Sequence, residues 1–178
     1  MPKWTGSVPD LLTLWTVIIN SEVENHYVYL CIPEGVWELG KYLSLNDARN
    51  DVDDEKMDEF LRQPDYWRWI ERAYEEFFSE GLEDYQQRGI YGYYAGRAQK
   101  WDIAYEQFHK SKMKFESCLG RRSRENMLIM YTFVCLKTGH DMEALEVGRV
   151  GLEMNHCPHC NTQFQKYIDI AEAKLKKR

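Results

Sequence analysis

The sequence predicts an all-α protein in which helical hairpins stack behind an N-terminal helical segment. Ala104 follows Trp101 and Asp102 in one predicted helix, and Ala144 follows Asp141 in another, forty residues later. A small residue that recurs at a fixed interval, followed by an apolar face, is typical of stacked helical hairpins. Apolar side chains also recur every three or four residues through most of the chain, as helices require.

Composition limits the class of protein. Hydrophobic residues make up 44% and charged residues 29% of the chain, which fits a folded domain and excludes a disordered one. No apolar run approaches the roughly 20 residues that a membrane helix needs, and the N-terminus lacks the pattern of a secretory signal. The five cysteines favour a reducing compartment over a disulfide scaffold. We therefore expect a cytoplasmic protein without a membrane segment.

Charge is distributed unevenly along the chain, whose net charge is −6. Residues 1–90 carry 8 Lys and Arg against 19 Asp and Glu, whereas residues 91–178 carry 15 against 10. Solvated helix faces would explain this difference. So would attraction of the basic half to an acidic partner, or of one half to the other within a fold or a homo-oligomer.

We expect residues 1–82 to form the N-terminal segment, which resembles no known family. An apolar stripe from Leu11 to Ile19 predicts a helix that starts near Pro9. Residues 22–32 fit either a continuation of this helix or a buried strand, and a second short helix follows over residues 36–43.

Two further helices are predicted in the N-terminal half. The acidic stretch of residues 46–59 lacks the ligand spacing of a calcium loop and instead predicts a helix that buries Met57 and Leu61 and stops at Pro64. Asp65 to Gly81 predicts an amphipathic helix, capped by the aspartate and ended by the glycine.

The second half, residues 83–178, predicts hairpins and a last helix. A glycine-rich pattern runs from Leu82 to Gln99, and bulky rings alternating with Gly92 and Gly96 indicate that another helix packs closely there. Later helices are expected over Asp102–Glu116, Arg124–Thr138 with Ser123 as cap, Met142–Met154 with Asp141 as cap, and Thr162–Lys177, with loops around Gly120 and over Asn155–Asn161.

Residues 83–178 resemble the tetratricopeptide repeat family. Tyr91 and Gly92 match the family's Leu-Gly pair, while Ala104 and Phe108 match its trailing-helix residues. The second unit matches less well, because Gly148 replaces the expected phenylalanine, and the period is 40 residues instead of 34. The resemblance implies a short right-handed solenoid of two hairpins, closed by a C-terminal capping helix.

The family's known work is protein–protein docking in a groove lined by the leading helices. The resemblance therefore implies an adaptor or scaffold that binds a protein or peptide partner through Tyr91, Tyr94, Arg97, Arg124, Met127, Leu128 and Tyr131. Basic side chains near residues 110–124 and 174–178 favour an acidic partner. Nucleic acid is disfavoured, because few aromatic residues lie between these basic residues and the protein as a whole is acidic.

Residues 155–160 hold the most suggestive chemistry, two cysteines spaced as Cys-x2-Cys with a histidine beside each. Two thiolates on one turn form half of a tetrahedral zinc site. The loop before each leading helix lies at one end of a repeat stack, which would bring a third cysteine to this turn. The candidate ligands of one structural zinc are Cys118, His156, Cys157, His159 and Cys160. An inert turn and a redox pair are the alternatives.

No nucleophile–base pair, phosphate loop or paired metal-binding histidines stands out in the sequence, so we expect a protein that is not an enzyme and name no catalytic residue. Two alternatives stay open. One is a zinc-stabilised regulatory protein that uses the Cys157 and Cys160 turn, and the other is a small helical enzyme with a pocket in its N-terminal half.

Overall fold

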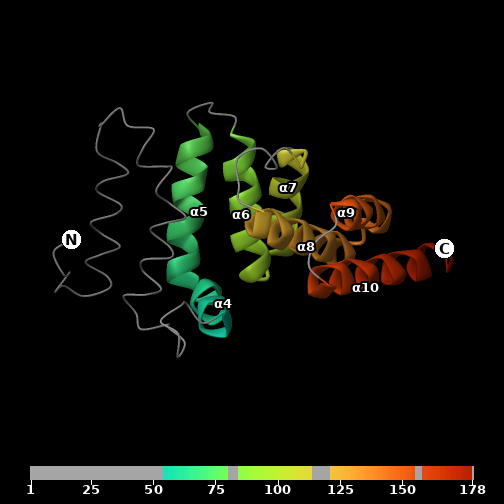
Figure 1. Cartoon of the computed structure of the whole chain (residues 1–178). Helices are drawn as coiled ribbons and strands as arrows, with labels where there is room; N and C mark the ends of the chain where they lie inside the picture. Colours follow the sequence, from blue (N-terminus) through green and yellow to red (C-terminus); the bar gives the residue numbers. More distant parts are fainter. Residues whose placement is uncertain (1–53, 80–83, 114–120, 155–157, 178) are drawn as a thin grey trace. The chain divides into compact units, whose positions relative to one another are not determined.

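The structure, a computed structural model, describes residues 54–79, 84–113, 121–154 and 158–177 (Figure 1). Every element within these ranges is an α-helix, which confirms the predicted all-α class. None of the described helices combines the length and the apolar character that crossing a bilayer requires. The helices expected before residue 53, and the choice between helix and strand at residues 22–32, lie outside the described residues.

The chain divides into two compact units, Met1–Glu83 and Asp84–Arg178. In the first unit, α4 (Asp54–Arg62) and α5 (Pro64–Ser79) are separated by Gln63 alone. Pro64 was expected only to end the earlier helix, but it is the first residue of α5, a position where proline loses no helical hydrogen bond. The apolar sides of both helices are buried through Met57, Leu61, Trp67, Ile70, Ala73, Tyr74 and Phe77.

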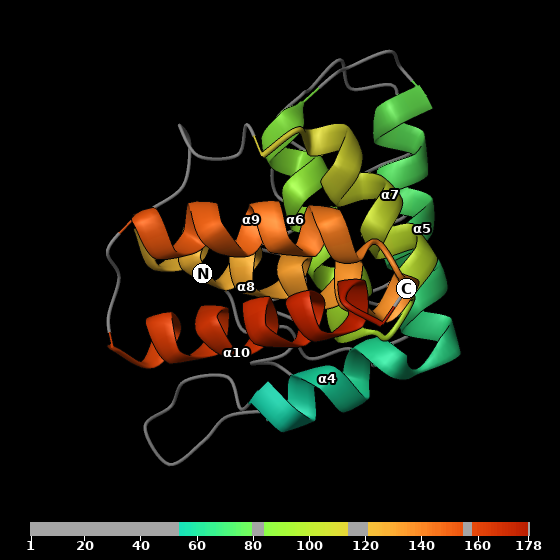
Figure 2. The same cartoon turned by 90° about the vertical axis from the view of Figure 1, so that its right-hand side faces the viewer.

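The described residues of the second unit form five helices, with α6 paired to α7 and α8 paired to α9 (Figures 1 and 2). The last helix packs against both α8 and α9. The first hairpin runs across the direction of the three later helices, which lie alongside one another in Figure 2. The helices are α6 (Tyr85–Arg97), α7 (Trp101–Ser111), α8 (Arg121–Thr138), α9 (Asp141–Glu153) and α10 (Pro158–Leu175).

Glycines set how closely the helices of this unit approach. A Cβ atom on Gly92 would lie 2.9 Å from the ring of Phe108, and one on Gly96 would lie 2.7 Å from the sulfur of Met130. This confirms the close packing predicted from the glycines of α6. Gly151 serves the same purpose later in the chain, because a Cβ atom there would overlap the ring of Phe164.

The turns of the two hairpins share one backbone geometry. Gln99 in the first turn and Gly139 in the second have positive φ angles of 60° and 79°. The N–H of Lys100 donates to the carbonyl of Ala95 at 2.8 Å, and the N–H of His140 donates to that of Cys135 at 2.9 Å. Both bonds span five residues, as in the left-handed ends of many helices, and they lie forty residues apart. The forty-residue period is therefore present in the backbone as well as in the alanines.

Several helix ends differ from the predicted ones. Helix α7 ends at Ser111, not Glu116, because Lys112 and Met113 take left-handed backbone angles that end the helix. Helix α8 already begins at Arg121, so Ser123 lies inside it and is not its cap. Asp84, which was not predicted as a cap, accepts hydrogen bonds from the first turn of α6.

The start of α9 also differs from the prediction. His140 holds the cap position, but its side chain makes no capping hydrogen bond, and Asp141 is the first helical residue. Asp141 is buried, and its carboxylate lies 3.3 Å from the ammonium of Lys174, which also donates to the carbonyl of Leu136 at 2.8 Å. One lysine of α10 thus holds the α8–α9 turn.

Candidate functional site

The predicted partner-binding residues lie mostly inside the protein. Tyr91, Tyr94, Arg97, Met127, Leu128 and Tyr131 are buried, and Arg124 is partly exposed. Tyr131 stacks on the ring of Phe108, with the ring centroids 4.9 Å apart, so its face contacts α7. In this structure these side chains offer little surface to a partner, and their binding role stays a prediction.

Helix α8 shows why sequence reasoning selected its inner face. Apolar residues occur on all sides of this helix, so periodicity alone does not tell which stripe is exposed. The buried stripe includes Leu128, Tyr131 and Cys135, whereas Ile129, Phe133 and Lys137 lie on the partly exposed side.

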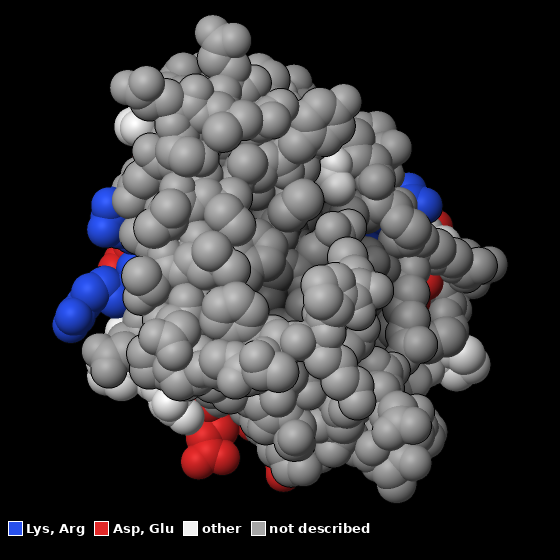
Figure 3. Space-filling view, turned by 90° about the vertical axis from the view of Figure 1, so that its left-hand side faces the viewer, with Lys and Arg blue, Asp and Glu red and all other residues white. Residues whose placement is uncertain are grey.

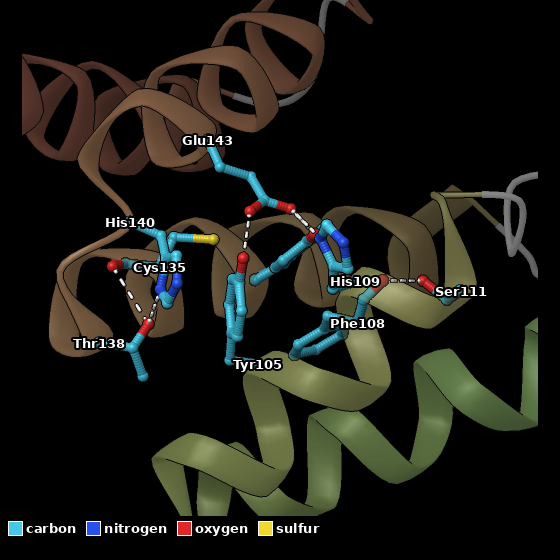
Figure 4. Close-up of polar contacts among 9 residues, drawn as sticks. Tyr105, Phe108, His109, Ser111, Cys135, Thr138, His140 and Glu143 are labelled. Atoms are coloured by element: carbon cyan, nitrogen blue, oxygen red, sulfur yellow. Dashed lines mark hydrogen bonds and ion pairs between the residues drawn. The ribbon is translucent and has the colours of Figure 1, made fainter.

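A cluster around Glu143, on α9, joins the two hairpins (Figure 4). The hydroxyl of Tyr105, on α7, donates to Glu143 Oε2 at 2.7 Å, and Nδ1 of His109 lies 3.0 Å from Oε1. The hydroxyl of Tyr131, on α8, also donates to Oε1. We call these four residues the Glu143 cluster. One carboxylate thus connects three helices.

The electrostatics of the Glu143 cluster favour a charged glutamate and neutral tyrosines. Partial burial alone would raise the pKa of Glu143, but hydrogen bonds from Tyr131, His109 and Tyr105 outweigh it and lower the pKa. Burial, and then the hydrogen bonds to Glu143, raise the pKa values of both tyrosines. The tyrosines therefore remain hydrogen-bond donors and the glutamate an acceptor at neutral pH.

Aromatic contacts extend the Glu143 cluster to the α8–α9 turn. The ring of Tyr105 stacks on His140, with centroids 3.6 Å apart, and also lies beside His109 at 5.5 Å. His140 Nδ1 lies 2.9 Å from the hydroxyl of Thr138, as Figure 4 shows. Burial, followed by the charge of Glu143, raises the pKa of the Cys135 thiol. The thiol is thereby kept protonated, so it is a poor nucleophile at neutral pH.

A second group of side chains forms a surface of a different kind, the aromatic ridge, defined as Trp101, Phe133, Lys137 and Tyr167. Trp101 meets Phe133 edge to face at 5.7 Å, and Phe133 lies 5.5 Å from Tyr167. The ammonium of Lys137 sits over both Phe133 and Trp101, at 5.1 and 5.8 Å. All three rings are partly exposed and Lys137 is exposed, so the ridge presents rings from α7, α8 and α10.

A pocket of about 370 Å³ adjoins the aromatic ridge at the α6–α7 turn. Trp101 and Ile103 supply apolar lining, and Lys100 and Lys137 supply positive charge. Asp102 also lines the pocket and carries the opposite charge. In the space-filling view of Figure 3, the described charged side chains that are visible lie at the edges of the face.

The predicted zinc ligands are only partly within the described residues. Cys118, His156 and Cys157 lie outside them, while His159 is exposed and Cys160 is buried in the first turn of α10. Cys160 was expected in a loop, but α10 begins four residues before the predicted start, at Pro158. Its thiol donates to Glu125 Oε2 at 3.4 Å. No group of three or more metal-binding side chains occurs among the described residues, and the zinc site stays a prediction.

Sequence reasoning missed both the Glu143 cluster and the aromatic ridge. The ridge left a usable signal, because Phe133 and Lys137 are one helical turn apart on the side of α8 opposite Tyr131. The cluster left none, since its residues come from three helices. Comparison of the chain with protein-family models, with curated proteins and with solved structures found no match.

Proposed function

We propose that the second unit is a protein-interaction module, an adaptor or scaffold that binds a protein or peptide partner through the aromatic ridge. The observation that carries the proposal is the row of partly exposed rings, Trp101, Phe133 and Tyr167, contributed by three different helices. Large aromatic side chains are enriched at the centres of protein interfaces, where a few of them supply most of the binding energy.

The arrangement of the ridge supports binding. Each ring is held by its neighbour, so little side-chain freedom would be lost when a partner covers the rings. Lys137 lies over two of these rings, and its flexible stem lets the charge follow a partner. The resemblance to tetratricopeptide repeats and the shared turn geometry of the hairpins point the same way, because helical repeats dock partners.

The reactive groups of the second unit favour binding over catalysis. Tyr105 and Tyr131 hold their protons and donate to Glu143, and the Cys135 thiol is buried and protonated. These groups are occupied in joining helices. The residues expected to line a solenoid groove are mostly buried, whereas the rings of the aromatic ridge are partly exposed. We therefore place binding on the ridge and not in a solenoid groove.

Site-specific photocrosslinking in the native host tests the proposal. A photoreactive phenylalanine analogue replaces Phe133 in the full chain, and the control carries it in place of Met142, an apolar residue of α9 that is 58% exposed. We expect a discrete protein adduct from position 133 that is missing from position 142. The same adducts from both positions, or none from position 133, would contradict the proposal.

A further inference from the structure

The pocket beside Trp101 combines two kinds of recognition. Its apolar wall is formed by Trp101 and Ile103, and its charged wall by Lys100 and Lys137. At about 370 Å³ the pocket lies at the small end of the roughly 300–1,000 Å³ typical of binding sites. This size suits a side chain or two of a peptide better than a cofactor.

The charges that face the pocket favour an anionic occupant. Among the described residues, two lysines line the pocket against the single carboxylate of Asp102. The second unit as a whole, residues 84–178, carries 16 Lys and Arg against 11 Asp and Glu. Lys137 lies over the rings of Trp101 and Phe133, so its ammonium lies beside an apolar residue of the pocket. An acidic group beside an apolar side chain would meet both walls at once.

We infer that the Trp101 pocket binds an acidic segment of a partner protein in which an aromatic or aliphatic residue adjoins an aspartate or glutamate. The apolar side chain enters beside Trp101 and Ile103, and the carboxylate lies between Lys100 and Lys137. The adjoining aromatic ridge covers the remainder of the segment. This inference rests on the proposed function, to which it adds the chemistry of the partner and the pocket that recognises the partner.

Selection from a random peptide library displayed on phage tests the inference, because the library imposes no particular partner sequence. The full chain is the bait, and each selected peptide is then synthesised and its affinity measured by fluorescence anisotropy. We expect the selected peptides to place Asp or Glu next to Trp, Phe or Leu. Basic or uncharged consensus peptides, or the absence of any enriched sequence, would overturn the inference.

Charge reversal assigns binding to the pocket. Lys137→Glu should lower the affinity for the acidic peptides at least about tenfold, which is equivalent to about 1.4 kcal/mol of binding free energy. Arg149→Glu makes the same reversal of charge at an exposed position of α9 and should leave affinity unchanged. A peptide with its acids replaced by lysine should regain affinity for the Lys137→Glu protein. Equal loss in both variants would show general charge attraction and overturn the inference.

Changes at Trp101 test the apolar wall. Trp101→Ala should remove the preference for peptides with an apolar residue, whereas Trp101→Phe keeps a ring and should retain it. Circular dichroism on both variants separates this effect from unfolding, and equal preference in the two folded variants would count against the inference. Light scattering tests whether a second copy of the chain occupies the pocket. A dimer that is lost in the Lys137→Glu variant would show that it does, and this result would overturn the inference of an acidic partner.

The two proposals fail in distinguishable ways. If the crosslinker at Phe133 captures a protein but the selected peptides are not acidic, the ridge binds a partner and only its inferred chemistry is wrong. If positions 133 and 142 give the same adducts, the proposed function itself fails.

Discussion

The two sides of α8 differ in their burial and in their contacts. On the inner side, Tyr131 is buried, stacks on Phe108 and donates to Glu143. On the outer side, Phe133 contacts the partly exposed rings of Trp101 and Tyr167, and Lys137 lies over the ring of Phe133. Aromatic residues two positions apart in one helix therefore serve opposite purposes. The inner side holds the two hairpins together, and the outer side leaves apolar area partly exposed.

The largest expected difference between the two sides comes from removing one ring from each. Phe108→Ala removes a side chain that is fully buried, so the free energy of unfolding should fall by about 3–5 kcal/mol. Phe133→Ala removes a ring that is already partly exposed and should cost clearly less. Urea denaturation of both variants measures this, and equal losses would show that the ridge belongs to the core.

The second difference concerns the carboxylate that joins the hairpins. Glu143→Ala leaves the buried hydroxyl of Tyr131 without this acceptor, so the free energy of unfolding should fall by about 1–3 kcal/mol. Glu146→Ala is the control, since Glu146 is an exposed glutamate of the same helix. If the two variants unfold at the same urea concentration, the Glu143 cluster adds nothing to stability.

The pH dependence of stability sharpens the same contrast. The folded protein lowers the pKa of Glu143 below the ordinary glutamate value of about 4.3. The resulting stabilisation is present above that value and is lost as the pH falls through the lower folded pKa. Glu143→Gln should therefore lose less stability than the wild type on acidification over this range. Parallel curves for the two proteins, measured by urea denaturation, would contradict this assignment.

The smallest expected effect on stability is at Lys137. Its ammonium over two rings is worth about 0.5–1 kcal/mol at an exposed site, so Lys137→Ala should change the free energy of unfolding by no more than that. The same variant should reduce crosslinking from position 133 to the partner. If the variant loses stability but still captures the partner, Lys137 stabilises the fold and does not take part in binding.

The sequence predicted the helical class and the close approach at Gly92 and Gly96, because each depends on local pattern or on a single small residue. Helix ends were predicted less well. The left-handed angle of Lys112 has no compositional signal, and Asp141 resembles a cap until its partner Lys174, from another helix, is known.

The candidate site was harder to predict than the fold. The resemblance to tetratricopeptide repeats selected Leu128 and Tyr131 on α8, and this helix is apolar on both sides, so its own pattern did not indicate that their stripe is buried. Packing against α6, α7, α9 and α10 decides which side is open, and those contacts join residues that are far apart in the chain. The Glu143 cluster, with donors at positions 105, 109 and 131, has the same long-range origin.

The buried thiol of Cys135 gives the protein a built-in reporter of opening. A thiol reagent reacts with the thiolate, which burial makes scarce, so alkylation at this position requires α8 to separate from its neighbours. The rate of labelling, followed at this one residue by mass spectrometry of digested samples, therefore measures how often the joined hairpins come apart under native conditions. A partner that covers the outer side of α8 would lower this labelling rate without contacting Cys135.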